Sequence, residues 1–202
     1  MRILAIGPHP DDIEYGCGGS LILHKNRGDE LFLLVLTKGE LSSGDKRVSE
    51  QESAARFLNA KLFWGGFMDT QIPEGRPVIE KIDQIIQEVN PDIVYVNYPD
   101  NTHQDHRNTG VSAMAACRYI KKVLFYEDYT TRNFEPTVFV DISAVLRQKI
   151  ELLECHHSQV TRKYPTGLNL IESVHAIASY RGFQGKVRYA EAFVPLRYLI
   201  EI

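Results

Sequence analysis

Cysteine is scarce in this chain: its 202 residues include three, Cys17, Cys117 and Cys155. They are odd in number and far apart, and none belongs to a C-x-x-C pair, which argues against a disulfide framework. We expect them to pack as buried small hydrophobes. Cys17 is the exception to watch, because it follows Asp12 closely and a role as nucleophile or ligand stays open there.

Long apolar runs and blocks of one charge are also missing. No apolar run approaches the roughly 18 residues of a membrane span. With a net charge of -3 and no basic stripe, the composition argues against a nucleic acid or a membrane surface as partner. The first residues enter an apolar run at once, without a charged segment and an apolar signal segment before it. We therefore expect a cytoplasmic protein.

The remaining composition is that of an ordinary globular protein, with 44% hydrophobic and 24% charged residues. A chain of 202 residues can form one domain with a substantial core. Repeats, low-complexity segments and long Pro/Gly/Ser linkers are absent from the sequence. We expect a single domain over residues 1–202.

Apolar runs and helical periods alternate along the chain. Continuous apolar runs predict strands, and apolar residues three and four apart predict helices. The predicted strands are 2–7, 31–36, 62–64, 93–96, 123–126 and 138–140, and the predicted helices are 16–28, 46–58, 78–89, 105–120 and 143–155. Ser143 can cap the last helix, and residues 163–185 are ambiguous but partly helical in pattern. The alternation predicts an α/β, Rossmann-like fold, a parallel sheet flanked by helices with strand order 3-2-1-4-5.

A histidine and two carboxylates stand where the first predicted strand ends, in the run His9-Pro10-Asp11-Asp12. Ligands bind at this edge of open α/β sheets, and His and Asp are ligands for divalent metals such as zinc. One carboxylate can bind the metal while the other takes a proton from water. The alternatives are a simple helix cap and a phosphate loop at residues 16–19. The phosphate loop fails, because the glycines do not follow the strand as G-x-G-x-x-G and the acidic pair would repel a pyrophosphate.

A second polar cluster, His103-Gln104-Asp105-His106, follows the fourth predicted strand. If a helix begins near His103, both histidines lie on one face of its first turn. Asp105 could then orient an imidazole. The alternative is a solvent-exposed polar loop. Because strands one and four are neighbours in the expected strand order, we expect the two clusters to converge.

Taken together, these motifs resemble the LmbE-like (PIG-L) superfamily of zinc-dependent N-deacetylases, which remove acetyl from N-acetylglucosamine groups. The resemblance covers residues 5–12, Glu14, Gly18 and Gly19, then Arg47, Glu50 and Ala54, and then residues 67–69, 103–106, 149–153, 156–159 and 189–193. Residues 156–159 and 189–193 look most like the bacillithiol-pathway branch.

This resemblance implies a role for each candidate residue. Zinc would be bound by His9, Asp12 and His106; the catalytic residues would be Asp11, His103 and Asp105; the substrate would be held by Arg47 and Asp69. Asp11 would be the general base, Asp105 would support an imidazole, and His103 would stabilise the oxyanion or protonate the departing amine. As a proton donor His103 needs a nearby carboxylate that raises its pKa. Iron also suits two imidazoles and one carboxylate.

The resemblance further implies a hydrolase for N-acetylglucosamine-type conjugates, which releases acetate and a free amine. Its partner would be a small amino-sugar conjugate, and self-association into a homo-oligomer is expected. Asn101 stands where some relatives carry a tyrosine, so a tyrosine contribution to oxyanion binding is left open. The alternatives are a hydrolase of another small N-acyl conjugate and a non-catalytic sugar-nucleotide binding module.

Overall fold

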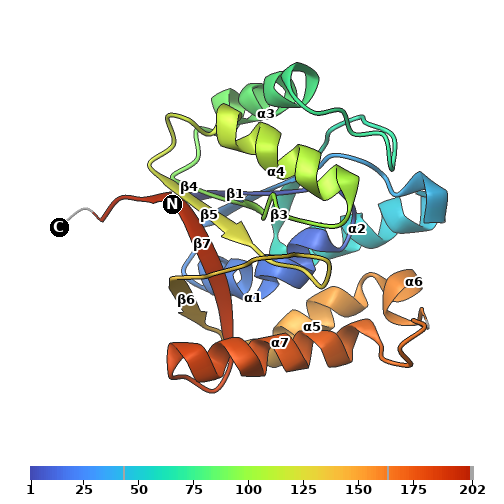
Figure 1. Ribbon diagram of the computed structural model, residues 1–202, viewed down its shortest axis with the longest axis vertical. Coiled ribbons are helices and arrows are strands. Elements are labelled where there is room, and N and C mark those ends of the chain that lie inside the picture. Colours follow the sequence, from blue (N-terminus) through green and yellow to red (C-terminus); the bar gives the residue numbers. More distant parts are fainter. Residues whose placement is uncertain (43, 163, 201–202) are drawn as a thin grey trace.

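Seven strands form one mixed sheet, in the order β3-β2-β1-β4-β5-β7-β6, in a computed structural model that describes residues 1–42, 44–162 and 164–200 (Figure 1). The strands are β1 (Arg2–Gly7), β2 (Glu30–Val35), β3 (Ala60–Trp64), β4 (Ile93–Asn97), β5 (Lys122–Tyr126), β6 (Val138–Asp141) and β7 (Ala190–Tyr198). The helices are α1 (Asp12–Asn26), α2 (Gly44–Leu58), α3 (Arg76–Val89), α4 (Gln104–Ala116), α5 (Leu146–Glu154), α6 (His157–Val160) and α7 (Leu170–Gly185), with a 3₁₀ turn at Glu40–Ser42.

Helices cover both faces of the sheet, as Figure 1 shows. Residues of α3 and α4 pack with one sheet face into one core cluster, and residues of α1, α2, α5 and α7 pack with the other. The central strands β1 and β4 are buried along almost their whole length. This double cover explains why their sequences are continuous apolar runs rather than alternating ones.

The predicted strand order 3-2-1-4-5 is confirmed, and β1 pairs in parallel with both β2 and β4. Each predicted strand and helix is present. The predicted strands β1–β5 form the expected parallel sheet, and β7, which was not predicted, makes the whole sheet mixed because it runs antiparallel to both β5 and β6. The sequence did not predict β7, because Glu191 and Pro195 interrupt the apolar pattern that is typical of a strand.

Two predicted helix starts also differ. Ser143 does not cap α5, which begins at Leu146; its hydroxyl instead accepts a hydrogen bond from the Tyr189 backbone N–H. α1 begins at Asp12, four residues before the predicted start at Gly16. The ambiguous segment 163–185 proves helical from Leu170 onward, and Lys163 lies outside the described residues.

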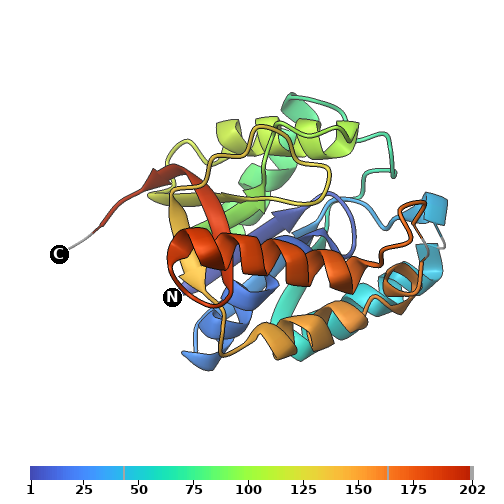
Figure 2. The ribbon, with the colours of Figure 1, turned by 60° about the horizontal axis from the view of Figure 1, so that its bottom comes forward.

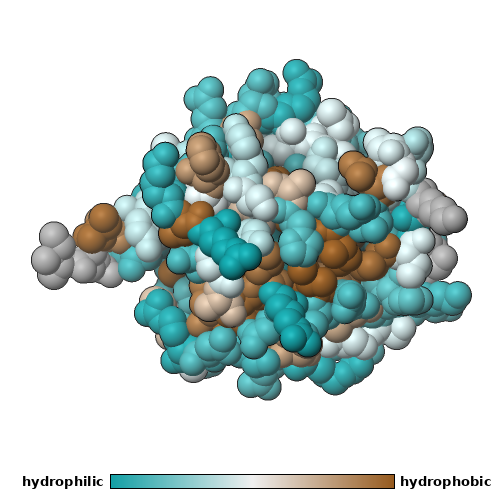
Figure 3. Space-filling view, turned by 90° about the horizontal axis from the view of Figure 1, so that it is seen from below, coloured by the Kyte–Doolittle hydropathy of each residue, from teal (hydrophilic) through white to brown (hydrophobic). Residues whose placement is uncertain are grey.

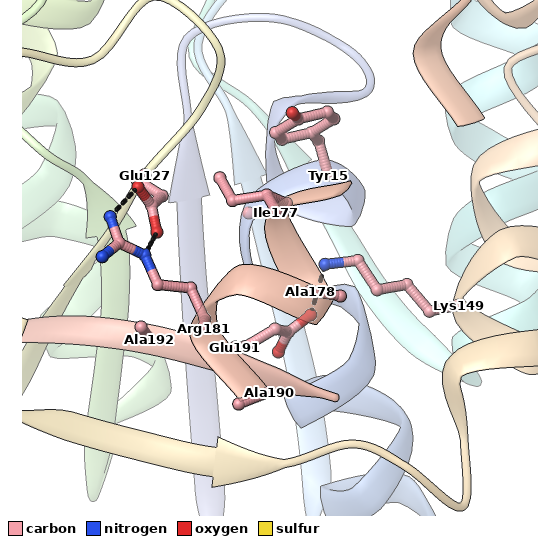
Figure 4. A pocket seen from close by; sticks show the side chains of 10 residues that line it. Tyr15, Glu127, Lys149, Ile177, Ala178, Arg181, Ala190, Glu191 and Ala192 are labelled. Carbon is pink, nitrogen blue, oxygen red and sulfur yellow. Dashed lines mark hydrogen bonds and ion pairs between the residues drawn. The ribbon is translucent and has the colours of Figure 1, made fainter. Parts of the chain in front are cut away.

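α1 is kinked at Cys17, where φ is -137° and ψ is 15°. Just beyond the kink, the carboxylate of Glu191 on β7 accepts hydrogen bonds from the N–H groups of Gly19 and Ser20, each at 2.7 Å. Lys149 on α5 pairs with the same carboxylate at 2.6 Å (Figure 4). Glu191 thus caps the second part of α1, a place where a negative charge is favoured. Within residues 189–193, which carry part of the resemblance, Glu191 therefore stabilises the fold.

Close packing explains the glycine at the start of this region. A Cβ atom on Gly16 would overlap the Tyr126 ring, whose hydroxyl donates a hydrogen bond to the Ile6 carbonyl at 2.8 Å.

Figure 4 also shows the ion pair between Arg181 on α7 and Glu127 after β5, at 2.6 Å. The contact fixes α7 against the end of β5, beside the loop that begins at Asp128.

α7 and α5 run side by side on the lower face of the molecule, and the C-terminal segment projects away from it (Figure 2). Seen from below, this face is largely hydrophilic, with one hydrophobic band along its middle (Figure 3). A groove between the two helices contains Leu146, Ile150 and Tyr189. Among the described residues, no helix is both long and apolar enough to cross a membrane.

Candidate functional site

A cleft of about 230 Å³ lies at the carboxyl ends of the central strands. It is lined by His9, Asp11, Asp12, Arg47, Asp69, Thr70, His103, His106, Asp128, Tyr129, Thr130, Gln159 and Arg162. The two sequence clusters therefore converge as expected, and they bring seven of the eight candidate residues to one cavity. The eighth, Asp105, is fully buried directly behind the lining.

Three of these side chains form a compact group of possible metal ligands, called the donor group below: His9, Asp12 and His106. The Asp12 Oδ2 atom lies 3.1 Å from His9 Nδ1 and 3.4 Å from His106 Nε2. One ligand atom from each of the three residues lies within 4.8 Å of the others, and the two imidazole centroids are 5.3 Å apart. Two imidazoles and one carboxylate suit a zinc ion with open positions, and also a non-haem iron ion. The residues present thus fit a divalent metal.

A tight turn separates the two neighbouring carboxylates. Asp11 has a left-handed backbone with φ of 92°, which costs a non-glycine residue about 1–3 kcal/mol and must be held by its surroundings. The Asp11 N–H faces Gln51 Oε1 at 3.4 Å, and the Arg47 guanidinium donates to the Pro10 carbonyl. As a result, Asp12 turns to the histidines while Asp11 turns to Arg47, at 3.4 Å.

Asp11 does not act as the helix cap that the sequence left as an alternative. It occupies the N-cap position of α1, but its side chain makes no capping hydrogen bond. Burial, opposed by the charge of Arg47 and assisted by that of Asp12, raises the pKa of Asp11 to about 6. A carboxylate with a pKa near neutrality is well matched to general base catalysis.

His9 is held from its other side by carboxylates. Its Nε2 atom lies 3.1 Å from Asp69 Oδ1 and 3.1 Å from Asp105 Oδ2. Burial lowers the pKa of His9, but the hydrogen bonds with Asp105, Asp12 and Asp69 outweigh it and raise this pKa well above its usual range. His9 is therefore paired with carboxylates on both ring nitrogens.

Asp105 supports an imidazole, but not one of its neighbours in the sequence. Its carboxylate faces His9 and also accepts hydrogen bonds from the N–H groups of Thr70 at 2.7 Å and Ile72 at 3.3 Å. It thereby ties the loop after β3 to the start of α4. His9, His103 and Asp105 also have ligand atoms within 4.8 Å of one another. This second group is less suited to a metal, because two backbone N–H groups already occupy the carboxylate.

The carboxylate that supports His106 is Asp128, which sequence reasoning missed. Asp128 Oδ2 lies 2.7 Å from His106 Nδ1, and Asp128 also accepts from Thr130 and from the buried Asn101 side chain. Such a pair fixes the ring and leaves Nε2 free to bind a metal. The signal was present: Asp128 follows β5 by two residues, at the same sheet edge as the other two clusters.

His103 occupies the N-cap position of α4, where its Nδ1 atom accepts a hydrogen bond from the Asp105 N–H at 3.2 Å. The ring proton is therefore assigned to Nε2. Burial lowers the pKa of His103, and the charges of His9 and His106 lower it further. The charges of Asp105 and Asp12 raise the pKa of His103, but less than burial and the two histidines lower it, so the help that a proton donor needs from a carboxylate is outweighed. A neutral His103 is a hydrogen-bond donor rather than an acid.

A chain of buried polar groups lies behind Asp11. Gln51 donates to Glu14 at 2.7 Å, and Glu14 lies 3.3 Å from Nε2 of the fully buried His156. His156 therefore belongs to the supporting layer and does not line the cleft. Glu50 accepts from the backbone and hydroxyl of Ser158, both at 2.7 Å, and so holds α6.

The two candidate substrate contacts have structural neighbours as well. Arg47 is buried against Pro10 and Asp11, and Asp69 lies against His9. Both line the cleft. Their role in substrate binding stays a prediction.

The sequence of this chain is similar to those of known deacetylases. Residues 4–117 match the sequence model of the PIG-L family, described as GlcNAc-PI de-N-acetylase. The chain is 30% identical to the diacetylchitobiose deacetylase of Thermococcus kodakarensis, over 96% of this chain and 83% of that protein. It is 29% identical to the probable N-acetyl-alpha-D-glucosaminyl L-malate deacetylase 2 of Bacillus anthracis, over 80% of this chain and 83% of that protein.

The fold is similar to that of a solved structure. The conserved protein TT1542 of Thermus thermophilus superposes with a TM-score of 0.88 at 28% identity, over 100% of this chain and 97% of that one.

Proposed function

Because the chain belongs to the PIG-L family of de-N-acetylases, we propose that its cleft hydrolyses the N-acetyl group of an N-acetylglucosamine-type conjugate. The products are acetate and the free amine. The observation that carries this proposal is the convergence of His9 Nδ1 and His106 Nε2 on one oxygen of Asp12, beside a second carboxylate, Asp11, that is turned away from them. A pure binding module has no need of both a metal group and an adjacent base.

The metal would be held by His9, Asp12 and His106, and we propose zinc. A divalent ion held there would polarise a carbonyl and acidify water. Asp128 keeps the His106 proton on Nδ1, so that the unprotonated Nε2 atom faces Asp12 and can bind the metal. Asp69 and Asp105 hold the far side of the His9 ring in the same way.

Asp11 is the proposed general base. Its carboxylate borders the cleft next to the donor group, and its raised pKa allows it to accept a proton from the attacking water and to return it to the departing amine. Arg47, 3.4 Å away, limits the rise in that pKa and keeps the base charged near neutral pH.

His103 is the proposed donor to the oxyanion. Because its Nδ1 atom accepts from the Asp105 backbone, its Nε2–H is available to the carbonyl oxygen as negative charge develops there. A hydrogen-bond donor fixed in place before reaction needs no reorganisation. The proton for the amine then comes from Asp11, since His103 is neutral.

The substrate class is tested with purified protein that is stripped by a chelator and reloaded with zinc or, anaerobically, with ferrous iron. Acetate and primary amine are measured for N-acetylglucosamine, its disaccharide, its malyl glycoside and N-acetylated amino acids. Release of both products from the sugars, dependent on metal, is expected. Release from the amino acids alone would assign another N-acyl conjugate, and tight sugar binding without turnover would assign a binding module.

Self-association, which the sequence resemblance implies, is also proposed here. Light scattering of the purified chain measures it directly.

A further inference from the structure

A second groove opens beside the catalytic cleft. It measures about 360 Å³ and is lined by Tyr129, Tyr164, Pro165, Thr166, Leu168, Asn169, Leu170 and Ser173. Tyr129 lines both cavities, so the groove and the cleft lie next to each other. Its volume falls in the range of about 300–1,000 Å³ that is typical of small-molecule sites.

Aromatic contacts hold Tyr129 in place at this junction. Its ring lies edge-on to buried Tyr15, with centroids 5.6 Å apart, and to Tyr164, with centroids 6.0 Å apart. Tyr15 is itself fixed by a hydrogen bond of 3.2 Å to Ser173 on α7. Tyr129 nevertheless remains 60% exposed, and Leu168 across the groove is 54% exposed. The groove thus presents apolar surface to solvent on a supported framework.

The cleft and the groove differ in the charge of the residues that line them. The catalytic cleft contains four carboxylates, whereas the described residues that line the groove include no charged side chain. On the cleft side, the guanidinium carbon of Arg162 lies 5.6 Å from the centre of the Tyr164 ring. A carboxylate that lost water within the groove would find no charged partner among the described residues that line it, which is unfavourable.

We propose that this groove binds the part of the substrate that lies beyond the acetylated sugar, and that this part is an uncharged ring such as a second pyranose or an aryl group. The inference rests on the proposed function, because it places the reacting amide in the adjoining cleft. An uncharged ring offers an apolar face to Tyr129 and Leu168 and needs no counter-charge. The groove would therefore select substrates by their aglycone.

The test compares the methyl, 4-nitrophenyl and malyl glycosides of N-acetylglucosamine with zinc-loaded protein. We expect kcat/KM for the 4-nitrophenyl glycoside to exceed that for the methyl glycoside by about tenfold, the effect of one well-packed aromatic contact. Leu168→Asp should reduce this ratio toward one. The control Phe183→Asp changes an 81% exposed residue of α7 outside the groove and should leave the ratio as it is.

Three results of this comparison would overturn the inference. Equal kcat/KM for the methyl and 4-nitrophenyl glycosides, or a ratio that Leu168→Asp does not move, overturns the inference and leaves the proposed function intact. Preference for the malyl glycoside that Arg162→Gln abolishes also overturns it, in favour of an anionic aglycone on Arg162.

If no glycoside is deacetylated, the proposed function fails and calorimetry decides the inference separately. Binding of the 4-nitrophenyl glycoside about tenfold tighter than the methyl glycoside supports the groove, and equal binding overturns it.

Discussion

Replacing Asp128 by asparagine should disrupt metal binding without touching a proposed ligand. The Asp128 carboxylate is surrounded by donors: His106 Nδ1 at 2.7 Å, the Thr130 N–H at 2.6 Å, the Thr130 hydroxyl at 2.7 Å and the Asn101 amide at 2.9 Å. An asparagine offers one acceptor oxygen and one NH₂ group. Whichever way the amide is turned, its NH₂ group faces another donor.

The magnitude follows from these contacts. Loss of a carboxylate that supports a ligating histidine lowers metal affinity by about 10–100-fold, which corresponds to about 1.4–2.7 kcal/mol. A buried donor left without a partner further lowers the free energy of unfolding by about 1–3 kcal/mol. We therefore expect Asp128→Asn to bind zinc about 10–100-fold more weakly and to unfold at a lower urea concentration.

Competition with a chromophoric chelator at pH 7.5 measures the zinc affinity, and urea unfolding followed by circular dichroism measures stability. The matched control is Asp100→Asn, in the neighbouring loop, whose carboxylate accepts only an exposed hydrogen bond from Asn133 among the contacts described. Saturating zinc should restore much of the variant's activity. An unchanged zinc affinity would refute the assignment of His106 as a ligand held by Asp128.

Three further predictions concern catalysis, stability and pH. Asp11→Asn should lower kcat by about 10²–10⁴-fold while zinc remains bound, as measured by acetate release and metal analysis; near-normal turnover would remove Asp11 from the mechanism. Glu191→Gln leaves buried Lys149 without its counter-charge and should lower the free energy of unfolding by about 3–5 kcal/mol, whereas Glu88→Gln, in an exposed pair with Lys61, should cost at most about 1 kcal/mol by urea unfolding. Burial lowers the pKa of His24 in the folded state, so the unfolded chain gains its proton first and stability is lost as pH falls below about 6.5. The urea midpoint of His24→Gln should therefore fall less between pH 7.5 and 5.5 than that of the wild type, and equal falls would contradict the shift.

The sequence predicts most of the sheet and the position of the cleft. Strands buried on both faces must be apolar throughout, so β1 and β4 are visible as short runs without any knowledge of their partners. The polar residues that follow such runs necessarily meet at one edge of a parallel sheet. That rule is sufficient to bring His9 and His106 together across almost a hundred residues of chain.

Other features depend on contacts between distant segments, and periodicity does not report those. In β7, Glu191 caps the kinked α1 and pairs with Lys149, so a buried charged residue stands near the start of this strand. The pattern that predicts strands counts apolar residues and therefore passes over it.

The sequence alone determines which residue types reach the cleft, because chain order and burial place them at strand ends. Only the tertiary structure decides which of them pair. Asp105 supports His9 rather than an adjacent histidine, and His106 takes Asp128 from the next strand. The reason is physical: a hydrogen bond depends on distances and angles to within a few tenths of an ångström, and these are set by how loops from several strands pack together.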